Sequence, residues 1–559
     1  MPPFKQLSTW QETVAQLQDH LASSIAPFLP SKPLPSPLPL NVTALPSQYL
    51  SESDFTLTSL APETLIARLA SGSLTSAAVT TAFLRRAALA SKLTNCITEL
   101  LPSALTRSAE LDAYYKQHGK PIGPLHGLPI SVKEHLGLEG LDNNAGYVSW
   151  IGNVAPRDAL IVDLLKQAGA VIYARTTQPQ TLMHLETSSN IYGETVNPYN
   201  RKLTAGGSSG GEGALVGMRG SVLGIGTDIG GSIRSPAANC GVYGLRPTSY
   251  RLPNEGGIAT MLGQEHVVPV IGPLSTSLEG IRIFAKTLVD RKPWLRQPCL
   301  LPFPWKEENQ LPLGTDGKPR LKVAVLWDDE VVKPHPPILR ALREVVGKLK
   351  DAPDVEVVTW KPYKHFQAWE IIASLYFADG GKETSAAIEA SSEPWRPLSS
   401  WIVRENPYAK ALSVSEVWDW TMRREAYKAE YAALWNATAT GTDENGVPIG
   451  MVDVILCPVG PGTAPPLDCA RYWGYTAQWN VLDYPALVFP VTQVDPAIDV
   501  KEEEYTPRSN GMDEYNYKLY EPETYRDAPV SLQLVGRRYE DEKVIQALEF
   551  LKKYITLPL

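Results

Sequence analysis

The segment 204–247 constrains this chain more than any other, because glycine and serine gather there in two clusters, 206–211 and 227–234. Glycine loses more backbone entropy on folding than other residues. A folded chain therefore keeps it where the backbone approaches another group closely or takes a positive φ. Small residues around a serine also leave its hydroxyl accessible and the neighbouring amide N–H groups free. The segment indicates a serine nucleophile beside an oxyanion hole.

Two other interpretations of this segment are a flexible linker and a phosphate-binding loop. A linker does not fit, because apolar residues with the character of buried strand or helix positions alternate with the glycines. These residues are Leu215, Val216, Leu223, Ile225, Ile229 and Val242. A phosphate-binding loop fits poorly, since neither cluster ends in Gly-Lys-Ser/Thr and no Gly-x-Gly-x-x-Gly follows a strand here.

The segment resembles the signature of the amidase signature family, which are serine hydrolases with a Ser–cis-Ser–Lys triad. Ser208 and Ser232 stand 24 positions apart, and the upstream motif GPLHGLPISVK, which ends at Lys133, is similar to the family's lysine motif. The resemblance covers roughly residues 57–551. It implies an α/β/α fold with a mixed central sheet of about eleven strands covered by helices, a size that open sheets reach.

The same resemblance implies a role for individual residues. Ser232 is the expected nucleophile and Lys133 the expected base. Ser208, in a cis peptide bond with Gly207, is expected to pass the proton between them. The oxyanion hole would consist of the backbone N–H groups of Ile229, Gly230, Gly231 and Ser232. The side chains expected to hold this loop in place are Thr227, Asp228 and Arg234.

Lys133 can serve as a base only when it is neutral. The ordinary pKa of lysine is about 10.4, and burial lowers it. The residues before Lys133, from Leu125 to Val132, are mostly apolar and read as a strand. We therefore expect Lys133 to lie buried at the end of this strand, with a pKa lowered by about three units.

Several alternatives for these residues stay open. Ser232 could cap a helix over 233–238, Ser209 competes with Ser208, and Asp228 with Arg234 could form a simple surface ion pair. A Ser-His-Asp hydrolase is the runner-up mechanism. Its candidate histidines are His126, His135 and His184, and none of them stands in a Gly-x-Ser-x-Gly context.

Within the family, the chain most resembles fungal acetamidase-type amidases, at 123–131, 179–183, 195–198 and 480–486. The resemblance implies an amidohydrolase that forms an acyl-enzyme and releases ammonia or an amine, acting on small aliphatic or aryl amides. The alternatives are a fatty acid amide hydrolase acting on long-chain acyl amides, a tRNA-dependent amidotransferase subunit, and a non-catalytic binding protein. Candidate pocket residues, with ordinary core as their alternative, are Leu182, Met183, Tyr192 and Trp479.

Composition excludes other classes of protein and ligand. A net charge of −8 without Lys/Arg-rich blocks argues against nucleic-acid binding. Five scattered cysteines favour reduced thiols. We find neither a signal peptide nor an apolar run of about 18 residues, so we expect a cytoplasmic enzyme without a transmembrane helix. Histidine spacing typical of a metal site is absent, and we expect no metal and no cofactor. The expected partner is a small-molecule amide, and a homodimer stays open.

Patterning predicts residues 1–56 to form a helix and a proline-rich wrapping segment, followed by one amidase domain over 57–559. The signature core is about 121–250, and 495–527 is expected to be a surface insertion that could form a hairpin. Expected helices are 8–25, one opening at Pro62 and one at Thr75-Ser76, 107–118, 160–168, 337–350, a helical region over 366–434, and 541–554. Expected strands are 130–132, 170–173, 321–326, 452–457, 484–491 and 530–535.

Overall fold

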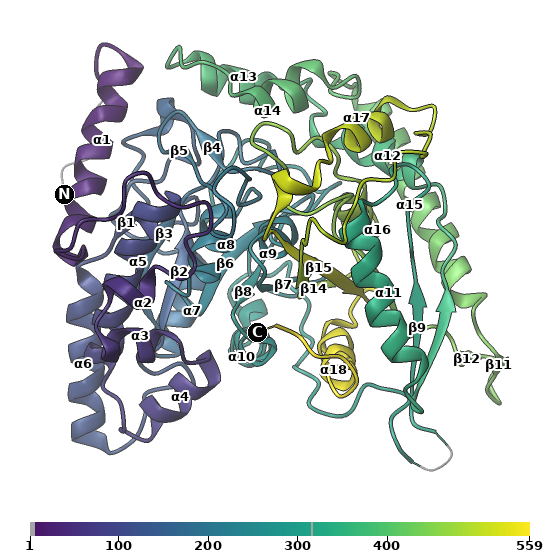
Figure 1. Cartoon of the computed structure of the whole chain (residues 1–559), viewed down its shortest axis with the longest axis horizontal. Helices are drawn as coiled ribbons and strands as arrows, with labels where there is room; N and C mark the ends of the chain where they lie inside the picture. Colours follow the sequence, from purple (N-terminus) through teal and green to yellow (C-terminus); the bar gives the residue numbers. More distant parts are fainter. Residues whose placement is uncertain (1–5, 315–316, 559) are drawn as a thin grey trace.

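The computed structural model describes residues 6–314 and 317–558, and its centre is a mixed β-sheet surrounded by helices (Figure 1). The sheet strands are β1 (Ile97–Leu100), β2 (Pro129–Lys133), β3 (Val171–Thr176), β6 (Leu223–Asp228), β7 (Tyr243–Arg246), β8 (Val270–Ser275), β9 (Leu321–Val325), β10 (Val355–Thr359), β13 (Val454–Pro458), β14 (Ala486–Gln493) and β15 (Pro529–Val535). Their order in this described part is β1-β3-β2-β6-β8-β7-β14-β15-β13-β9-β10. The expected α/β fold with eleven sheet strands is confirmed. Two short strand pairs lie outside the sheet, β4 (Ser188–Ser189) with β5 (Gly193–Glu194), and β11 (Gly441–Thr442) with β12 (Pro448–Ile449).

Several helices begin at a capping side chain. Thr9 and Glu12 form a capping box at the start of the first helix, and Thr75 accepts from Ala78 N–H at the start of the fifth. The helices are α1 (Trp10–Ile25), α2 (Pro46–Tyr49), α3 (Glu52–Thr58), α4 (Pro62–Ala70), α5 (Ser76–Thr94), α6 (Ser103–His118), α7 (Leu160–Gln167), α8 (Gly210–Gly217), α9 (Arg234–Asn239), α10 (Leu278–Asp290), α11 (Pro336–Lys350), α12 (His365–Tyr376), α13 (Lys382–Glu389), α14 (Pro397–Ser400), α15 (Val414–Asn436), α16 (Gly474–Leu482), α17 (Gly511–Leu519) and α18 (Asp541–Leu551).

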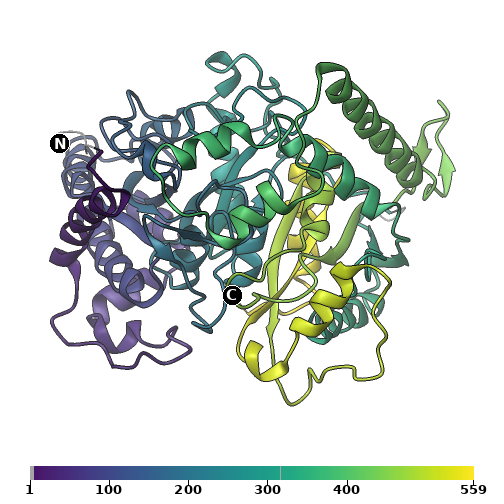
Figure 2. The same ribbon diagram turned by 90° about the horizontal axis from the view of Figure 1, so that it is seen from above.

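The N-terminal helix α1 packs as the sequence predicts. Its apolar side chains Val14, Leu17 and Leu21 are buried and contact a cluster that includes Val148 and Ile191. After a short turn of helix, the proline-rich segment that follows holds no regular helix or strand until α2. Helix α1 and the β11–β12 pair lie at opposite ends of the molecule (Figure 2).

The topology of the sheet brings the two predicted motifs together. Strand β2 pairs in parallel with β6, with Ser131 opposite Gly224 and Val132 opposite Ile225. Parallel neighbours end at the same edge of a sheet, so Lys133, the last residue of β2, lies beside Thr227 and Asp228 at the end of β6. Helices α8 and α9, which follow the two glycine clusters, contact each other.

The structure corrects several details of the sequence reading. The segment 495–527 does not form a hairpin: it contains helix α17, which Asn510 caps by accepting from Asp513 N–H. Strand β10 and helix α3 were not expected, and α6 begins four residues before the predicted start at 107. Among the described residues, no helix has the length and apolarity needed to cross a membrane.

Candidate active site

Lys133 is fully buried at the end of β2 and contacts two hydroxyl groups. Its Nζ lies 2.6 Å from Ser208 Oγ and 3.0 Å from Thr227 Oγ1. Burial lowers the pKa of Lys133 to about 7, although the charges of Asp228 and Glu212 oppose this shift. A large share of this lysine is therefore neutral at physiological pH, as a base must be.

The first glycine cluster places Ser208 against Lys133. The peptide bond between Gly207 and Ser208 is cis. Any side chain at Gly207 would overlap the backbone of Glu186, so only glycine fits there. Ser209 joins the two clusters: its N–H donates to the Ser232 carbonyl (3.1 Å), and its Oγ accepts from Thr227 N–H (3.2 Å). Ser209 is thus held away from Lys133, whereas Ser208 faces it.

Ser232 and Ser208 line the same pocket. Ser232 does not cap helix α9, because the N-cap position belongs to Ile233 and no side chain caps that helix. Among the described residues, no hydrogen bond joins the hydroxyls of Ser208 and Ser232. Such contacts are often long without substrate and tighten when it binds.

The loop that ends at Ser232 presents backbone amides toward the pocket, and Gly231 is the exception among them. In the described part of the chain, the N–H groups of Ile229, Gly230 and Ser232 have no hydrogen-bond partner. The N–H of Gly231 donates to Asp228 Oδ1 (2.9 Å). The Ile229 carbonyl accepts from Tyr376 Oη (2.8 Å). Because the C=O and N–H of a trans peptide point in opposite directions, this bond turns the Gly230 N–H away from Tyr376.

Asp228 and Arg234 form a buried pair rather than a surface pair, since neither side chain is exposed. Two hydrogen bonds of 3.0 Å join the guanidinium to the carboxylate. Asn480 donates to Asp228 and accepts from Arg234, and Asp228 also accepts from Ile233 N–H. Burial opposes ionisation, but Arg234 and Asn480 hold the pKa of Asp228 at about 2. The pair therefore fixes the loop that carries Ser232.

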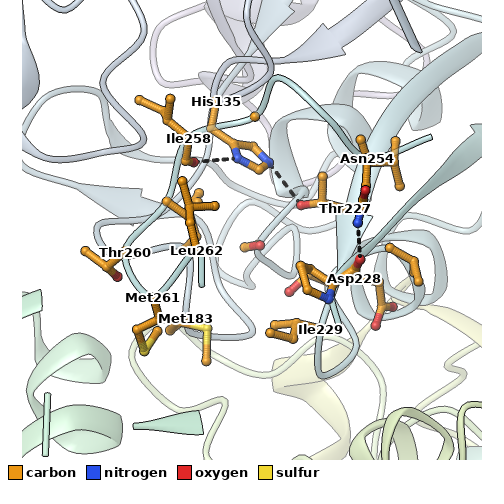
Figure 3. A pocket seen from close by; sticks show the side chains of 18 of the residues that line it. His135, Met183, Thr227, Asp228, Ile229, Asn254, Ile258, Thr260, Met261 and Leu262 are labelled. Carbon is orange, nitrogen blue, oxygen red and sulfur yellow. Dashed lines mark hydrogen bonds between the residues drawn. The ribbon is translucent and has the colours of Figure 1, made fainter. Parts of the chain in front are cut away.

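The two serines line a cavity of about 120 Å³. Figure 3 shows this cavity from close by. Its other lining residues are mostly apolar and include Leu182, Met183, Ile258, Met261 and Leu262. Leu182 and Met183 are two of the four candidate pocket residues. Tyr192 and Trp479 do not line this cavity. The Tyr192 hydroxyl accepts from Asn144, and Trp479 packs edge-on against His365 and Tyr431, so both belong to the core.

Sequence reasoning missed the loop 254–264, which closes one side of the cavity, and it considered His135 only as a candidate base and not as a pocket residue. The loop carries no motif, whereas the position of His135, two residues after Lys133, was a usable signal. The ring of His135 bonds to Thr227 and Ile258 and makes no hydrogen bond to Ser232. His126 accepts from Ile122 N–H. Over residues 6–314 and 317–558, no group of three His, Cys, Asp or Glu side chains could hold a metal ion.

Known proteins resemble this chain over almost its whole length. The family model described as Amidase matches residues 78–545. The chain is 45% identical to "Putative amidase C550.07" of Schizosaccharomyces pombe, covering 97% of this chain and 98% of that protein. It is 39% identical to an acetamidase of Emericella nidulans, covering 98% of each. The solved structure of a fatty acid amide hydrolase superposes with a TM-score of 0.91 at 35% identity, covering 98% of this chain and 95% of that chain.

The family match spans far more than half of the chain, the sequence relatives are amidases in name, and the solved amide hydrolase has a similar fold. The chain therefore belongs to the amidase signature family and is an amide hydrolase.

Proposed function

We propose that this enzyme cleaves amides through an acyl-enzyme on Ser232, with Ser208 and Lys133 relaying the proton. The observation that carries the proposal is the contact of 2.6 Å between Lys133 Nζ and Ser208 Oγ. It lies beside a pocket lined by both serines, and burial lowers the pKa of the lysine to about 7.

In the first half-reaction, Ser232 Oγ attacks the amide carbon and gives its proton to Ser208, which passes its own proton to Lys133. The free N–H groups of Ile229, Gly230 and Ser232 stabilise the oxyanion, each by about 3–4 kcal/mol. The proton then returns through Ser208 to the leaving nitrogen, and the C–N bond breaks. Water hydrolyses the acyl-enzyme by the same relay, which restores Ser232 and releases the acid.

Ile229, Gly230 and Ser232 form the core of the proposed oxyanion hole. Gly231 was also expected to contribute, but its N–H already donates to Asp228. We therefore assign Gly231, with Thr227, Asp228 and Arg234, to holding the loop in shape.

Small aliphatic or aryl acyl groups are the proposed substrates. The cavity of about 120 Å³ is comparable to an engineered cavity of about 150 Å³ that binds benzene. The acetamidase relative supports short acyl groups. The structural likeness to a fatty acid amide hydrolase favours the alternative, long-chain acyl amides. A long acyl chain would have to displace loop 254–264 or extend beyond this cavity.

The test is a panel of amides, from acetamide through benzamide and an anilide to a long-chain fatty amide, with Ser232→Ala as control. Preference for the short or aryl members supports the proposal. Preference for the fatty amide replaces it with the long-chain alternative. If the isolated chain cleaves none of them while a fluorophosphonate still labels Ser232, a dedicated substrate or a partner subunit is required.

A further inference from the structure

His135 stands two residues after Lys133, and its ring lies between the catalytic edge of the sheet and the loop that closes the pocket (Figure 3). Nδ1 is 3.0 Å from the Ile258 carbonyl oxygen, and Nε2 is 3.1 Å from Thr227 Oγ1. The backbone of His135 is fixed as well, because its N–H donates to Gln178 Oε1 (3.0 Å). The ring therefore has a fixed position against Thr227.

The partners of the ring determine its tautomer. A carbonyl oxygen can only accept a hydrogen bond, so Nδ1 carries a proton. Burial, and then the charge of Lys133, lower the pKa of His135 to about 3, so the ring is neutral at physiological pH. A neutral imidazole has one N–H. Nε2 is therefore unprotonated and accepts from Thr227.

This assignment fixes the hydroxyl of Thr227. Its single proton is donated to His135 Nε2, so Thr227 Oγ1 offers only lone pairs to Lys133 Nζ, 3.0 Å away. Neutral Lys133 has two N–H donors and one lone pair. An N–H of Lys133 binds Thr227, and the lone pair stays available for the hydroxyl proton of Ser208, at 2.6 Å.

We propose that His135 is a positioning residue that keeps the lone pair of Lys133 for Ser208. It does so by accepting a hydrogen bond from the Thr227 hydroxyl. Without His135, this hydroxyl would compete with the Ser208 hydroxyl as a hydrogen-bond donor to the lone pair of Lys133. This inference rests on the proposed triad. The titratable groups that face Lys133 are His135, Asp228 and Glu212, and Lys133 is the titratable group that faces His135.

Two substitutions of His135 separate its two hydrogen bonds. His135→Asn can keep a donor near the position of Nδ1 for the Ile258 carbonyl, but it lacks an acceptor at the position of Nε2. His135→Gln can place an amide oxygen near the position of Nε2 and so restores the acceptor for Thr227. The rate is the Ser232-dependent hydrolysis of 4-nitrophenyl acetate, and thermal unfolding shows that each variant is folded.

The expected result is that His135→Asn lowers kcat/KM about 10- to 100-fold, as a misplaced catalytic group does, and that His135→Gln recovers most of this loss. The Thr227 proton freed in His135→Asn stabilises neutral Lys133, so the acidic limb of the pH profile moves to lower pH. If the substitution instead let water into the site, Lys133 would be better solvated and its pKa would rise. The acidic limb would then move to higher pH. In a Thr227→Val background, His135→Asn should have no further effect, because it acts through that hydroxyl.

An unchanged rate in His135→Asn, a limb that moves to higher pH, or losses that add in the double variant would overturn the inference. Lys133→Met, measured in the same assay, separates a failure of the positioning role of His135 from a failure of the proposed triad. If Lys133→Met keeps the wild-type rate, the triad itself is wrong. If Lys133→Met is inactive and His135→Asn is normal, only the positioning role is wrong.

Discussion

Replacing Lys133 by methionine should abolish activity and stabilise the fold. The unfolded lysine stays protonated up to about pH 10.5, whereas burial lowers its pKa in the folded state to about 7. The unfolded state therefore binds more protons between these pH values, and stability rises with pH across this window. The loss of folding stability caused by burying Lys133 is therefore largest below pH 7. At pH 7 this penalty, which the difference between the two pKa values sets, is about 4 kcal/mol.

Methionine removes this penalty but also removes two hydrogen bonds, to Ser208 and Thr227, worth about 1 kcal/mol each. The net gain is about 2 kcal/mol at pH 7. The unfolding entropy of 559 residues is about 1.2 kcal/mol per kelvin, so the melting temperature should rise by about 2 °C. A rise in stability with a loss of function is the trade-off expected where a buried ionisable group serves the proposed reaction.

Thermal unfolding at pH 7 and again above pH 9 tests this reasoning, with the exposed Lys348→Met as the matched control. The advantage of Lys133→Met over the wild type should shrink as the pH rises. A variant that melts below the wild type at pH 7, or an advantage that does not change with pH, would refute the view of Lys133 as a buried, neutral base.

Further predictions concern the pH profile, the buried ion pair and a glycine of the proposed oxyanion hole. In the wild type, kcat/KM should rise with pH to a plateau with a midpoint near the Lys133 pKa of about 7, and a midpoint near the ordinary value of about 10.4 would contradict a desolvated base. Arg234→Gln leaves Asp228 unpaired and should lower stability by about 3–5 kcal/mol in thermal unfolding. Adding Asp228→Asn should recover part of this loss, and additive losses would argue against coupling. Gly230→Ala places a Cβ 2.5 Å from Tyr376 Oη and should lower kcat about 10²- to 10³-fold by displacing an amide donor, so a wild-type kcat would exclude that amide from the hole.

Local signals predicted much of the fold. The capping residue Thr75, the helix-opening Pro62 and the apolar runs around Ile130 and Val171 each predict an element that the structure contains. Strand β10 was missed because exposed residues such as Glu356 interrupt its apolar pattern. The hairpin expected in 495–527 was wrong because this segment contains a helix, α17. The signal for that helix is a single residue, the N-cap Asn510.

The residues of the proposed triad could be selected from the sequence because glycine clusters and a lysine after an apolar strand are local patterns. The pocket was not, because its walls come from distant segments that only the fold brings together. Trp479 illustrates the difficulty: an aromatic residue near a motif can fill the core as well as a cavity, and here it packs on His365. The bond between Thr227 and His135 likewise depends on the pairing of β2 with β6 and cannot be derived from either motif alone.

The most direct test of the central claim is to trap the acyl-enzyme and locate the acyl group. The enzyme is mixed with 4-nitrophenyl acetate, quenched with acid within the burst, digested and mapped by mass spectrometry, with Ser232→Ala and Ser208→Ala treated in parallel. The proposed mechanism predicts one acetyl group per chain on Ser232, absent in Ser232→Ala and slow to form in Ser208→Ala. An acetyl group on Ser208, or turnover without any covalent adduct, would contradict it.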